Sequence, residues 1–426
     1  MRILVLSQYW NPENGVPQRR WSWLTEILQN AGHEVVAVVP PPHYKRMVSI
    51  REWVASKGFC PERFLTKGEK GETLLRSGYF PAGNSLTKRI FNQAWTAFSM
   101  LLTVVRPTGP LRDYRPDVVI GTVPALPTAA VTFLAAKRFG TPFIIDLRDA
   151  WPALFRESSN WNTGTGTPSI REQFFTRGPL QILVKVTEKM LERVLGAADG
   201  IITTSAALQA LLSQQYDAQI ATVRNVFPSP PSVLRKDVPD NKRQLRVLYA
   251  GTLGRAQKLE NALVAAKIAQ ENGIDVELRF VGDGATWDAL RTRAAELEIN
   301  FHLEHQRNPD DLLAHYEWAD TALVHLTEWD SLRAAVPSKT YELMTNRIHI
   351  SGVVSGETAN LITSLKAGDV VPPNNPQALA ELWVRLTNNR SRLVVGDEGR
   401  RWVERERKVE APAALLSLLE RCTKSQ

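Results

Sequence analysis

Residues 337–342 (Pro-Ser-Lys-Thr-Tyr-Glu) bring three different polar groups within two turns of a predicted helix. They follow an apolar, strand-like run, and Pro337 suits the first helical position. Ser338 and Glu342 then share one helix face, with Lys339 beside them. A hydroxyl, a carboxylate and an ammonium near a positive helix end suit a ligand with phosphate and vicinal hydroxyls, as in sugar nucleotides. Taken alone, the six residues favour a surface Lys339–Glu342 ion pair.

A second charged segment, residues 146–152 (Asp-Leu-Arg-Asp-Ala-Trp-Pro), ends a predicted buried strand. Charges at the end of a buried strand need partners, because burying an unpaired charge is costly. One interpretation is an internal ion pair between Arg148 and an aspartate. We favour the other interpretation, in which Asp149 and Arg148 hold the hydroxyl group of an acceptor substrate.

Three further loops could bind phosphate at the carboxyl ends of predicted strands. Residues 251–258 (Gly-Thr-Leu-Gly-Arg-Ala-Gln-Lys) offer backbone N–H groups around Gly254, and Arg255 and Lys258 could neutralise a diphosphate. The turn that begins at Gly282 would let its backbone approach a ligand.

The third of these loops, residues 12–17 (Pro-Glu-Asn-Gly-Val-Pro), precedes the first predicted helix. Gly15 permits close backbone approach, and the helix start beyond it offers unpaired N–H groups to an anion. A tight turn without a ligand is an equally good interpretation of this loop. It is not a G-x-G-x-x-G fingerprint, so a dehydrogenase is disfavoured.

The elements that must position these loops alternate between apolar strands and helices, which predicts parallel sheets covered on both faces. The predicted strands are 2–7, 34–39, 117–121, 142–147, 200–204, 221–226, 246–250, 276–281, 300–303, 321–326, 348–353 and 369–371. The proline-rich stretch 227–242 reads as a linker between two Rossmann-like domains, at 1–226 and 243–409. A helix at about 410–426, with a break at Pro412, would cross back to the first domain. Ligands are then expected in the cleft at the strand ends.

Composition excludes several classes of function. The chain has 426 residues, 43% of them apolar and 23% charged, which is typical of a globular protein of two domains. Its two cysteines, Cys60 and Cys422, are too few for a disulfide framework or a metal site and fit a reducing cytoplasm. The N-terminal residues 1–10 lack a small-residue cleavage site and read as a buried strand rather than a signal peptide.

Positive charge is concentrated in residues 45–115, which carry 13 Lys and Arg against five Asp and Glu, within a net charge of +8. The apolar run 90–105 lies in the same stretch and is too short to span a bilayer. The combination predicts peripheral contact with an anionic membrane, although a core helix with solvated basic loops explains residues 90–105 equally well. Nucleic acid is a poorer candidate, because no reader motif accompanies the charge.

Several motifs together carry a resemblance that covers nearly the whole chain. They are Pro12-Glu13-x-Gly15 with Arg19-Arg20-Trp21, Gly32-His33-Glu34-Val35, Asp146-x-Arg148-Asp149-x-Trp151-Pro152, Tyr249-Ala250-Gly251-Thr252-Leu253-Gly254, Gly282-Asp283-Gly284, Pro337-Ser338-Lys339-x-x-x-Glu342, Gly356-Glu357 and Val370-Val371-Pro372. This set resembles family 4 retaining glycosyltransferases, and most of all the lipopolysaccharide and capsule enzymes related to N-acetylfucosamine transferases.

The resemblance implies a GT-B fold, no metal or other cofactor, and a nucleoside-diphosphate sugar held mainly by the second domain. It places the ribose hydroxyls on Glu342 and the diphosphate on Lys258, with the loop at Gly15 closing over the phosphates. Three positions depart from the family pattern. The first Glu of the usual Glu-x7-Glu pair is Ala334, the usual arginine of the first glycine loop is Thr252, and Gly121-Thr122 stands where a histidine is frequent.

We therefore expect a retaining hexosyl- or N-acetylhexosaminyltransferase with a polyprenyl-diphosphate-linked glycan as acceptor, at the inner face of the cytoplasmic membrane. The candidate catalytic residues are Lys258, Arg255, Asp149 and Arg148, and the candidate donor-binding residues are Gly15, Gly254, Gly282, Pro337, Ser338, Lys339 and Glu342. Two alternatives remain open. One is a GT-B epimerase of nucleotide sugars, and the other is an inactive partner that binds lipid or sugar.

Overall fold

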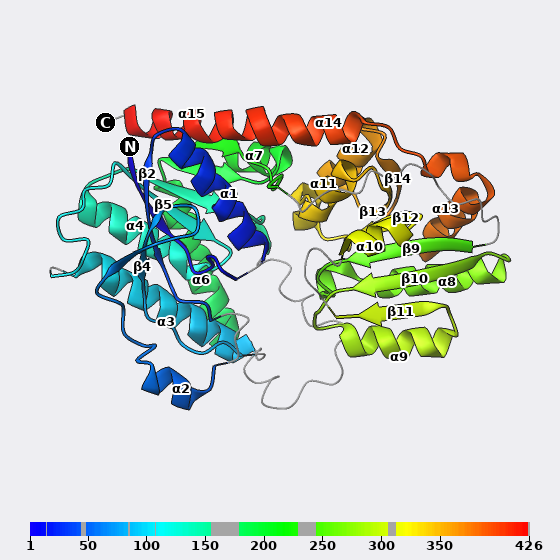
Figure 1. The fold of residues 1–426 in the computed structure, drawn as a ribbon, viewed down its shortest axis with the longest axis horizontal. Helices are drawn as coiled ribbons and strands as arrows, with labels where there is room; N and C mark the ends of the chain where they lie inside the picture. Colours follow the sequence, from blue (N-terminus) through cyan, green and yellow to red (C-terminus); the bar gives the residue numbers. More distant parts are fainter. Residues whose placement is uncertain are drawn as a thin grey trace.

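Two parallel β-sheets, one in each half of the chain, form the frame of the molecule (Figure 1). The structure is a computed structural model and describes residues 1–13, 15–43, 48–83, 86–106, 108–154, 179–228, 244–305 and 312–424. The first sheet has eight strands and the second has six. We propose that the domain boundary falls within residues 227–242, most of which lie outside the described residues.

The first sheet has the strand order β3-β4-β2-β1-β5-β6-β7-β8. Its strands are β1 (Arg2–Leu6), β2 (Glu34–Val39), β3 (Leu65–Lys67), β4 (Thr73–Arg76), β5 (Val118–Val123), β6 (Phe143–Leu147), β7 (Gly200–Thr203) and β8 (Gln219–Thr222). All neighbouring strands are parallel except the edge pair β3 and β4. Because the strands are parallel, their carboxyl ends meet at a single edge of the sheet.

Helices cover both faces of the first sheet, because successive side chains of a strand point to opposite faces. Ile3 and Val5 of β1 belong to one hydrophobic cluster with Trp21, and Leu4 and Leu6 belong to another with Met100. The helices of this domain are α1 (Val16–Asn30), α2 (Ile50–Ala55), α3 (Leu86–Val105), α4 (Pro127–Phe139), α6 (Pro179–Gly196) and α7 (Ala206–Ser213).

The second sheet is parallel throughout, with the order β11-β10-β9-β12-β13-β14. Its strands are β9 (Gln244–Ala250), β10 (Asp275–Val281), β11 (Phe301–Glu304), β12 (Thr321–His325), β13 (His349–Val353) and β14 (Gly368–Val371). Its helices are α8 (Glu260–Glu271), α9 (Trp287–Leu297), α10 (Leu312–Trp318), α11 (Ser338–Thr345), α12 (Gly356–Ser364) and α13 (Pro376–Asn388), with short 3-10 turns at η2 (Arg255–Gln257), η4 (Asp330–Ala334) and η5 (Arg390–Leu393).

The C-terminal helical segment runs across both domains (Figure 1). Helix α14 (Glu398–Arg405) packs on α11 of the second domain, and α15 (Ala411–Lys424) packs on β7 and β8 of the first. The break predicted at Pro412 is absent. A stretch of π-helix, Glu406–Glu410, lies between α14 and α15 instead, and it widens the turn into which the proline ring would otherwise press.

Several predicted strand boundaries differ from the structure by one or two residues, and two of the differences between predicted and observed boundaries have a clear local cause. The strand predicted at 221–226 is β8, which ends at Thr222, because Arg224 and Asn225 leave the sheet to bond with other buried side chains. Helix α11 begins at Ser338, and Pro337 is its N-cap residue rather than its first residue. A proline has no N–H to donate, so either position at a helix start tolerates it.

In the described part of the chain, no helix combines the length and apolar content needed to cross a membrane.

Candidate functional site

The carboxyl ends of β1, β5, β6 and β7 bring a set of polar side chains together. The Thr122 hydroxyl donates to Ser7 Oγ at 3.0 Å, which links β5 to β1. The Thr204 hydroxyl donates to the Arg148 carbonyl oxygen at 2.9 Å, which fixes the loop after β6 against β7. These contacts hold Arg148 and Asp149 at the edge of the first sheet where a ligand is expected.

Asp146 is a structural residue with internal partners. Its two carboxylate oxygens accept bonds of 3.2 and 2.8 Å from Nε and Nη2 of Arg20, and Trp21 Nε1 donates to it at 2.9 Å. Arg20 and Asp146 are both completely buried. Among the described residues, the internal ion pair between Arg148 and an aspartate considered for this loop does not form, and Asp146 pairs with Arg20 instead.

Arg148 is left with an unsatisfied guanidinium group. Its Nε and Nη1 atoms are shielded from solvent and have no hydrogen-bond partner among the described residues. Burial lowers the pKa of Arg148, while the charges of Asp149 and Asp146 act against this. Since shielded donors are normally paired, these two atoms indicate a site for an anionic or hydroxyl-bearing ligand.

Asp149 lies next to this guanidinium in a cavity between the two domains. Burial raises the pKa of its carboxyl group, and Arg148 opposes the shift. The residue still exposes surface to solvent, as expected for a group in a cleft that protein surrounds on most sides. The cavity is lined from the first domain by Arg148, Asp149, Ala150, Leu154, Thr204 and Leu208, and from the second by Ser331, Leu332, Ala334 and Ala335.

The two glycine turns of the second domain pack against each other. A Cβ atom on Gly282 would overlap the carbonyl oxygen of Gly251, and one on Gly284 would overlap that of Leu253. The N–H groups of Gly251 and Leu253 donate to the carbonyls of Val281 and Asp283, at 2.8 and 2.9 Å. Position 282 therefore requires glycine because the Gly251 backbone packs against it. The sequence had suggested that a ligand makes this close approach, and that explanation was wrong. Direct contacts of Gly282 and Gly254 with a nucleoside-diphosphate sugar stay predictions.

Lys339 points into this glycine loop. Its Nζ atom lies 3.6 Å from the centroid of the Tyr249 ring and is so close to Gly251 that a Cβ atom there would overlap it. Although part of the residue is accessible, Nζ is buried and has no hydrogen-bond partner among the described residues. Burial lowers the pKa of Lys339 to about 7, with Glu342 acting against the shift. The surface ion pair with Glu342 is therefore excluded.

Glu342 is half-buried on the same helix, as is Ser338. The Tyr316 hydroxyl donates a hydrogen bond to the Glu342 carboxylate, and burial together with this carboxylate raises the pKa of Tyr316. A carboxylate has room for about four hydrogen bonds, so one internal donor leaves capacity for a ligand. The structure brings Glu342 close to Lys339, as the sequence predicted.

Lys258 and Arg255 lie at the neighbouring strand end. Arg255 begins η2, and the Ala256 carbonyl of that turn accepts a 2.8 Å bond from Thr327 N, just after β12. Lys258 is exposed. Burial lowers the pKa of His325, at the end of β12, to about 3, and the charge of Lys258 lowers it further. Both cations therefore follow β9 and stand beside β12, the two strands whose ends also flank Lys339.

Gly15 is the N-cap residue of α1, after the carboxyl end of β1. Its φ angle of −155° is extended. An added Cβ atom would clash only with the flexible Gln18 side chain and would make an ordinary contact with Pro17. The backbone therefore does not require glycine at this position, and its contact with donor phosphates remains a prediction. Asn14, in the same loop, lies outside the described residues.

Sequence reasoning assigned no role to the contact that joins the domains on one side. The Glu357 carboxylate of α12 accepts bonds from the backbone N–H groups of Ala206 and Ala207, at 3.2 and 2.6 Å, and pairs with Arg224. An acidic group at the N-terminus of α7 is stabilised by the helix dipole. The motif Gly356-Glu357 was its only signal. Tyr316 and Thr204 were also missed, because neither belongs to a motif.

The overall structure resembles solved glycosyltransferase structures. Sucrose-phosphate synthase from Thermosynechococcus elongatus superposes with a TM-score of 0.66 at 15% identity, covering 100% of this chain and 99% of that one. HepE from Anabaena, solved in complex with UDP and glucose, gives a TM-score of 0.60 at 12% identity, with 100% and 99% covered. Two facing parallel-sheet domains of this kind define the GT-B class, which confirms the predicted fold.

Sequence comparison gives the family. Residues 15–226 match the model described as "Glycosyl transferase 4-like domain", and residues 232–409 match "Glycosyl transferases group 1". The two matches cover most of the chain, which belongs to this family of glycosyltransferases. It is 26% identical over 363 residues to the putative colanic acid biosynthesis glycosyl transferase WcaI of Escherichia coli, covering 83% of this chain and 82% of WcaI. The narrower resemblance to N-acetylfucosamine transferases stays a prediction.

Proposed function

We propose that this glycosyltransferase moves a hexosyl or N-acetylhexosaminyl group from a nucleoside diphosphate to a hydroxyl acceptor, with retention of anomeric configuration. The observation that carries the proposal is the unpartnered Nζ of Lys339, buried beside the Gly251 loop on the helix that also bears Glu342. A buried cation without a partner is costly, and a phosphate group would supply the missing charge.

The donor site is formed by cations and a carboxylate at neighbouring strand ends. Lys339, Lys258 and Arg255 would neutralise the diphosphate as it leaves, so that the chain's own residues supply the charge stabilisation without a metal ion. Glu342 would accept hydrogen bonds from the ribose hydroxyls. A uridine nucleotide is the first candidate, by analogy with the UDP and glucose in the HepE complex.

The attacking hydroxyl group of the acceptor would occupy the cavity between the domains, whose volume of about 20 Å³ has room for one such group. Asp149 and the unpaired donors of Arg148 would orient the attacking hydroxyl, whose oxygen replaces the diphosphate oxygen at the anomeric carbon on the same face of the sugar. The acceptor proton passes to the departing diphosphate, so no side-chain nucleophile is required. We propose as acceptor a glycan carried on polyprenyl diphosphate, used at the inner face of the cytoplasmic membrane. By analogy with WcaI, which is named for colanic acid biosynthesis, the product would be a polysaccharide.

Replacing Glu342 with alanine is expected to weaken donor binding by about 10- to 100-fold, because each lost charge-assisted hydrogen bond is worth roughly 1.5–3 kcal/mol. Isothermal titration with the sugar nucleotide measures this change. Glu271→Ala, at an exposed glutamate on α8 of the same domain, is the matched control and should bind like wild type. Unchanged affinity in a folded Glu342→Ala protein would remove Glu342 from the site.

The reaction itself is tested by product analysis. UDP-, GDP- and TDP-sugars are first ranked by thermal shift, and the best donor is incubated with and without a polyprenyl-diphosphate-linked monosaccharide. We expect release of the nucleoside diphosphate to depend on the acceptor, a product with the donor's anomeric configuration, and loss of turnover in Lys258→Ala. An epimerised sugar nucleotide formed without acceptor would replace the proposal with an epimerase, and absence of donor binding would indicate an inactive partner.

A further inference from the structure

The outer face of α3 is apolar although nothing in the described part of the chain covers it. Phe91, Phe98 and Leu102 expose 51, 53 and 44% of their surface, and their spacing places them on one stripe of the helix. The inner side of α3 is also apolar, since Met100 is completely buried in the core below. A surface helix of a water-exposed protein normally presents polar residues outward.

Aromatic contacts extend this stripe toward α2. Trp95 stacks on Phe91 with ring centroids 6.4 Å apart, and Trp53 of α2 meets Trp95 edge to face at 6.5 Å. Helix α2 has no buried residue, and it exposes 64% of Ile50 and 53% of Val54. The helix is held through Trp53, whose Nε1 donates to the Tyr79 carbonyl at 2.6 Å. Two helices thus share one apolar surface.

The edge strand β3 adds further exposed apolar residues. Phe64 just before it is 79% exposed, and Leu65 is 47% exposed. Edge strands are normally protected by charged side chains or by a helix or loop that covers them. Exposed apolar side chains at this edge therefore indicate contact with a membrane or with another molecule. We define the α3 face as these eight exposed apolar residues together: Ile50, Val54, Phe59, Phe64, Leu65, Phe91, Phe98 and Leu102.

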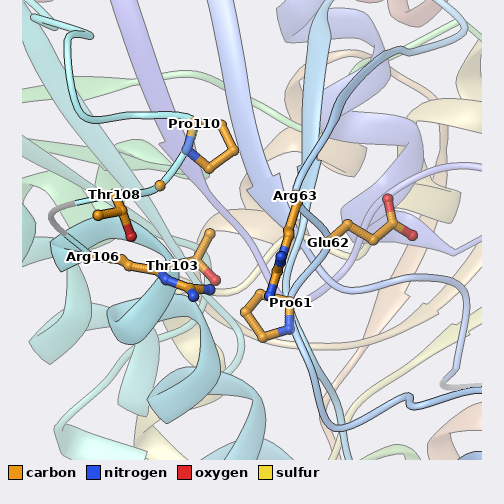
Figure 2. A pocket seen from close by; sticks show the side chains of 8 residues that line it. Pro61, Glu62, Arg63, Thr103, Arg106, Thr108 and Pro110 are labelled. Carbon is orange, nitrogen blue, oxygen red and sulfur yellow. The ribbon is translucent and has the colours of Figure 1, made fainter.

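A cavity of about 440 Å³ opens between the segment leading into β3 and the end of α3. It is lined by Pro61, Glu62, Arg63, Thr103, Arg106, Thr108, Gly109 and Pro110. The guanidinium groups of Arg63 and Arg106 turn toward one another across this cavity, whereas the Glu62 carboxylate points away (Figure 2). Within the described residues neither guanidinium forms an ion pair, so both are available to an anion.

Cations also mark the other end of the stripe. Lys88 and Arg89 are exposed in the first turn of α3, and Arg106 follows its last turn. An apolar stripe with cations at both ends matches an anionic bilayer surface, where apolar side chains enter the acyl boundary and cations meet headgroup phosphates. A nucleic acid would use the cations but leave the apolar stripe without a partner, and a protein partner would leave the surplus of cations unexplained.

We propose that the α3 face docks on an anionic lipid bilayer, with a headgroup phosphate held between Arg63 and Arg106. This inference goes beyond the transfer reaction, since docking requires neither donor nor acceptor. Apolar contact and charge both contribute, so binding depends on anionic lipid and weakens as salt screens the cations.

Co-sedimentation with vesicles tests the proposal. The wild-type protein is mixed with vesicles of phosphatidylcholine alone, or of phosphatidylcholine with phosphatidylglycerol, at low and high salt. We expect binding to the anionic vesicles at low salt. Phe98→Glu/Leu102→Glu and Arg63→Glu/Arg106→Glu should each weaken that binding by about tenfold or more, because they oppose the apolar and the charge contribution respectively.

The controls separate docking from folding and from catalysis. Val394→Glu and Arg401→Glu change an exposed apolar residue and an exposed cation of the second domain, and both should dock like wild type. Melting temperature and donor affinity in solution should be unchanged in the α3-face variants. The proposal is overturned if the wild-type protein stays in solution with anionic vesicles, or if these variants dock like wild type. It is also overturned if the wild-type protein is a dimer that the Glu substitutions convert to a monomer, because the α3 face would then be a dimer interface.

Discussion

Replacing Lys339 with methionine is expected to stabilise the free protein and to abolish its stabilisation by a sugar nucleotide. Among the described residues the buried Nζ atom has no hydrogen-bond partner, and the face of the Tyr249 ring and the charge of Glu342 are its compensation. Methionine fills a similar volume without the charge. The free energy of unfolding should rise by about 1–4 kcal/mol at neutral pH, which is the gain seen when buried ion pairs are replaced by well-packed apolar side chains. Chemical denaturation measures this gain, and thermal shift measures the lost response to donor.

The same residue predicts a dependence of stability on pH. Because burial lowers the pKa of Lys339 from 10.5 to about 7, the unfolded chain binds a proton between these values that the folded chain has released. The free energy of unfolding therefore increases with pH across this window, by up to about 1.4 kcal/mol per pH unit. Donor affinity should fall over the same range, since the diphosphate requires the charged ammonium.

Denaturation of wild type and Lys339→Met at about pH 7 and about pH 9 isolates this contribution, which the variant should lack. Lys267→Met, at a half-buried lysine on α8, is the matched control and should keep the wild-type slope. Identical pH slopes in wild type and Lys339→Met, or full donor binding by the variant, would show that Nζ has another partner in solution.

The substitutions Asp146→Asn and Asp149→Asn are expected to have opposite consequences, although the two aspartates stand three residues apart. Asp146→Asn leaves the buried Arg20 guanidinium without its counter-charge and should destabilise the fold by about 3–5 kcal/mol. The midpoint of urea denaturation reports this loss. A change of less than about 1 kcal/mol would mean that the pair is not buried as the structure has it.

Asp149→Asn is the companion variant and should fold like wild type, because the structure places Asp149 at the cavity between the domains rather than in the core. Its transfer rate should fall by about 100-fold or more, as for other groups that position or deprotonate a reacting hydroxyl. Donor binding should stay within a few-fold of wild type. Normal turnover in this variant would exclude Asp149 from the acceptor site.

Periodicity predicted most of the second sheet, because its strands are short apolar runs between clear helix patterns. The same reasoning did not predict the pair β3 and β4 or helix α2. All three elements are short, and β3 and α2 have no buried residue. The strand predicted at 221–226 lies too late in the chain, because Ala221–Val226 is apolar at both ends. In the structure β8 ends at Thr222, and the chain leaves the sheet to bring Arg224 to Glu357. Tertiary contacts, not local pattern, decided these cases.

At the candidate site, sequence spacing predicted which residues share a helix but not which of them are buried. Lys339 is one residue from Ser338, yet its Nζ atom faces Tyr249, which is 90 positions earlier in the chain. This contact depends on how α11 packs on the sheet. The roles of Asp146 and Asp149 differ because Arg20, on α1, reaches only the first of them. Such pairings between distant segments leave no signal in a single sequence.

The contact of Glu357 with the start of α7 has a mechanical consequence. It lies on the same side of the molecule as the long helical segment α14–α15 that spans both domains (Figure 1). A relative rotation of the two lobes would therefore pivot on this side, with Glu357 near the axis. Displacement grows with distance from a pivot, so such a rotation would change the separation of the two lobes most on the opposite side.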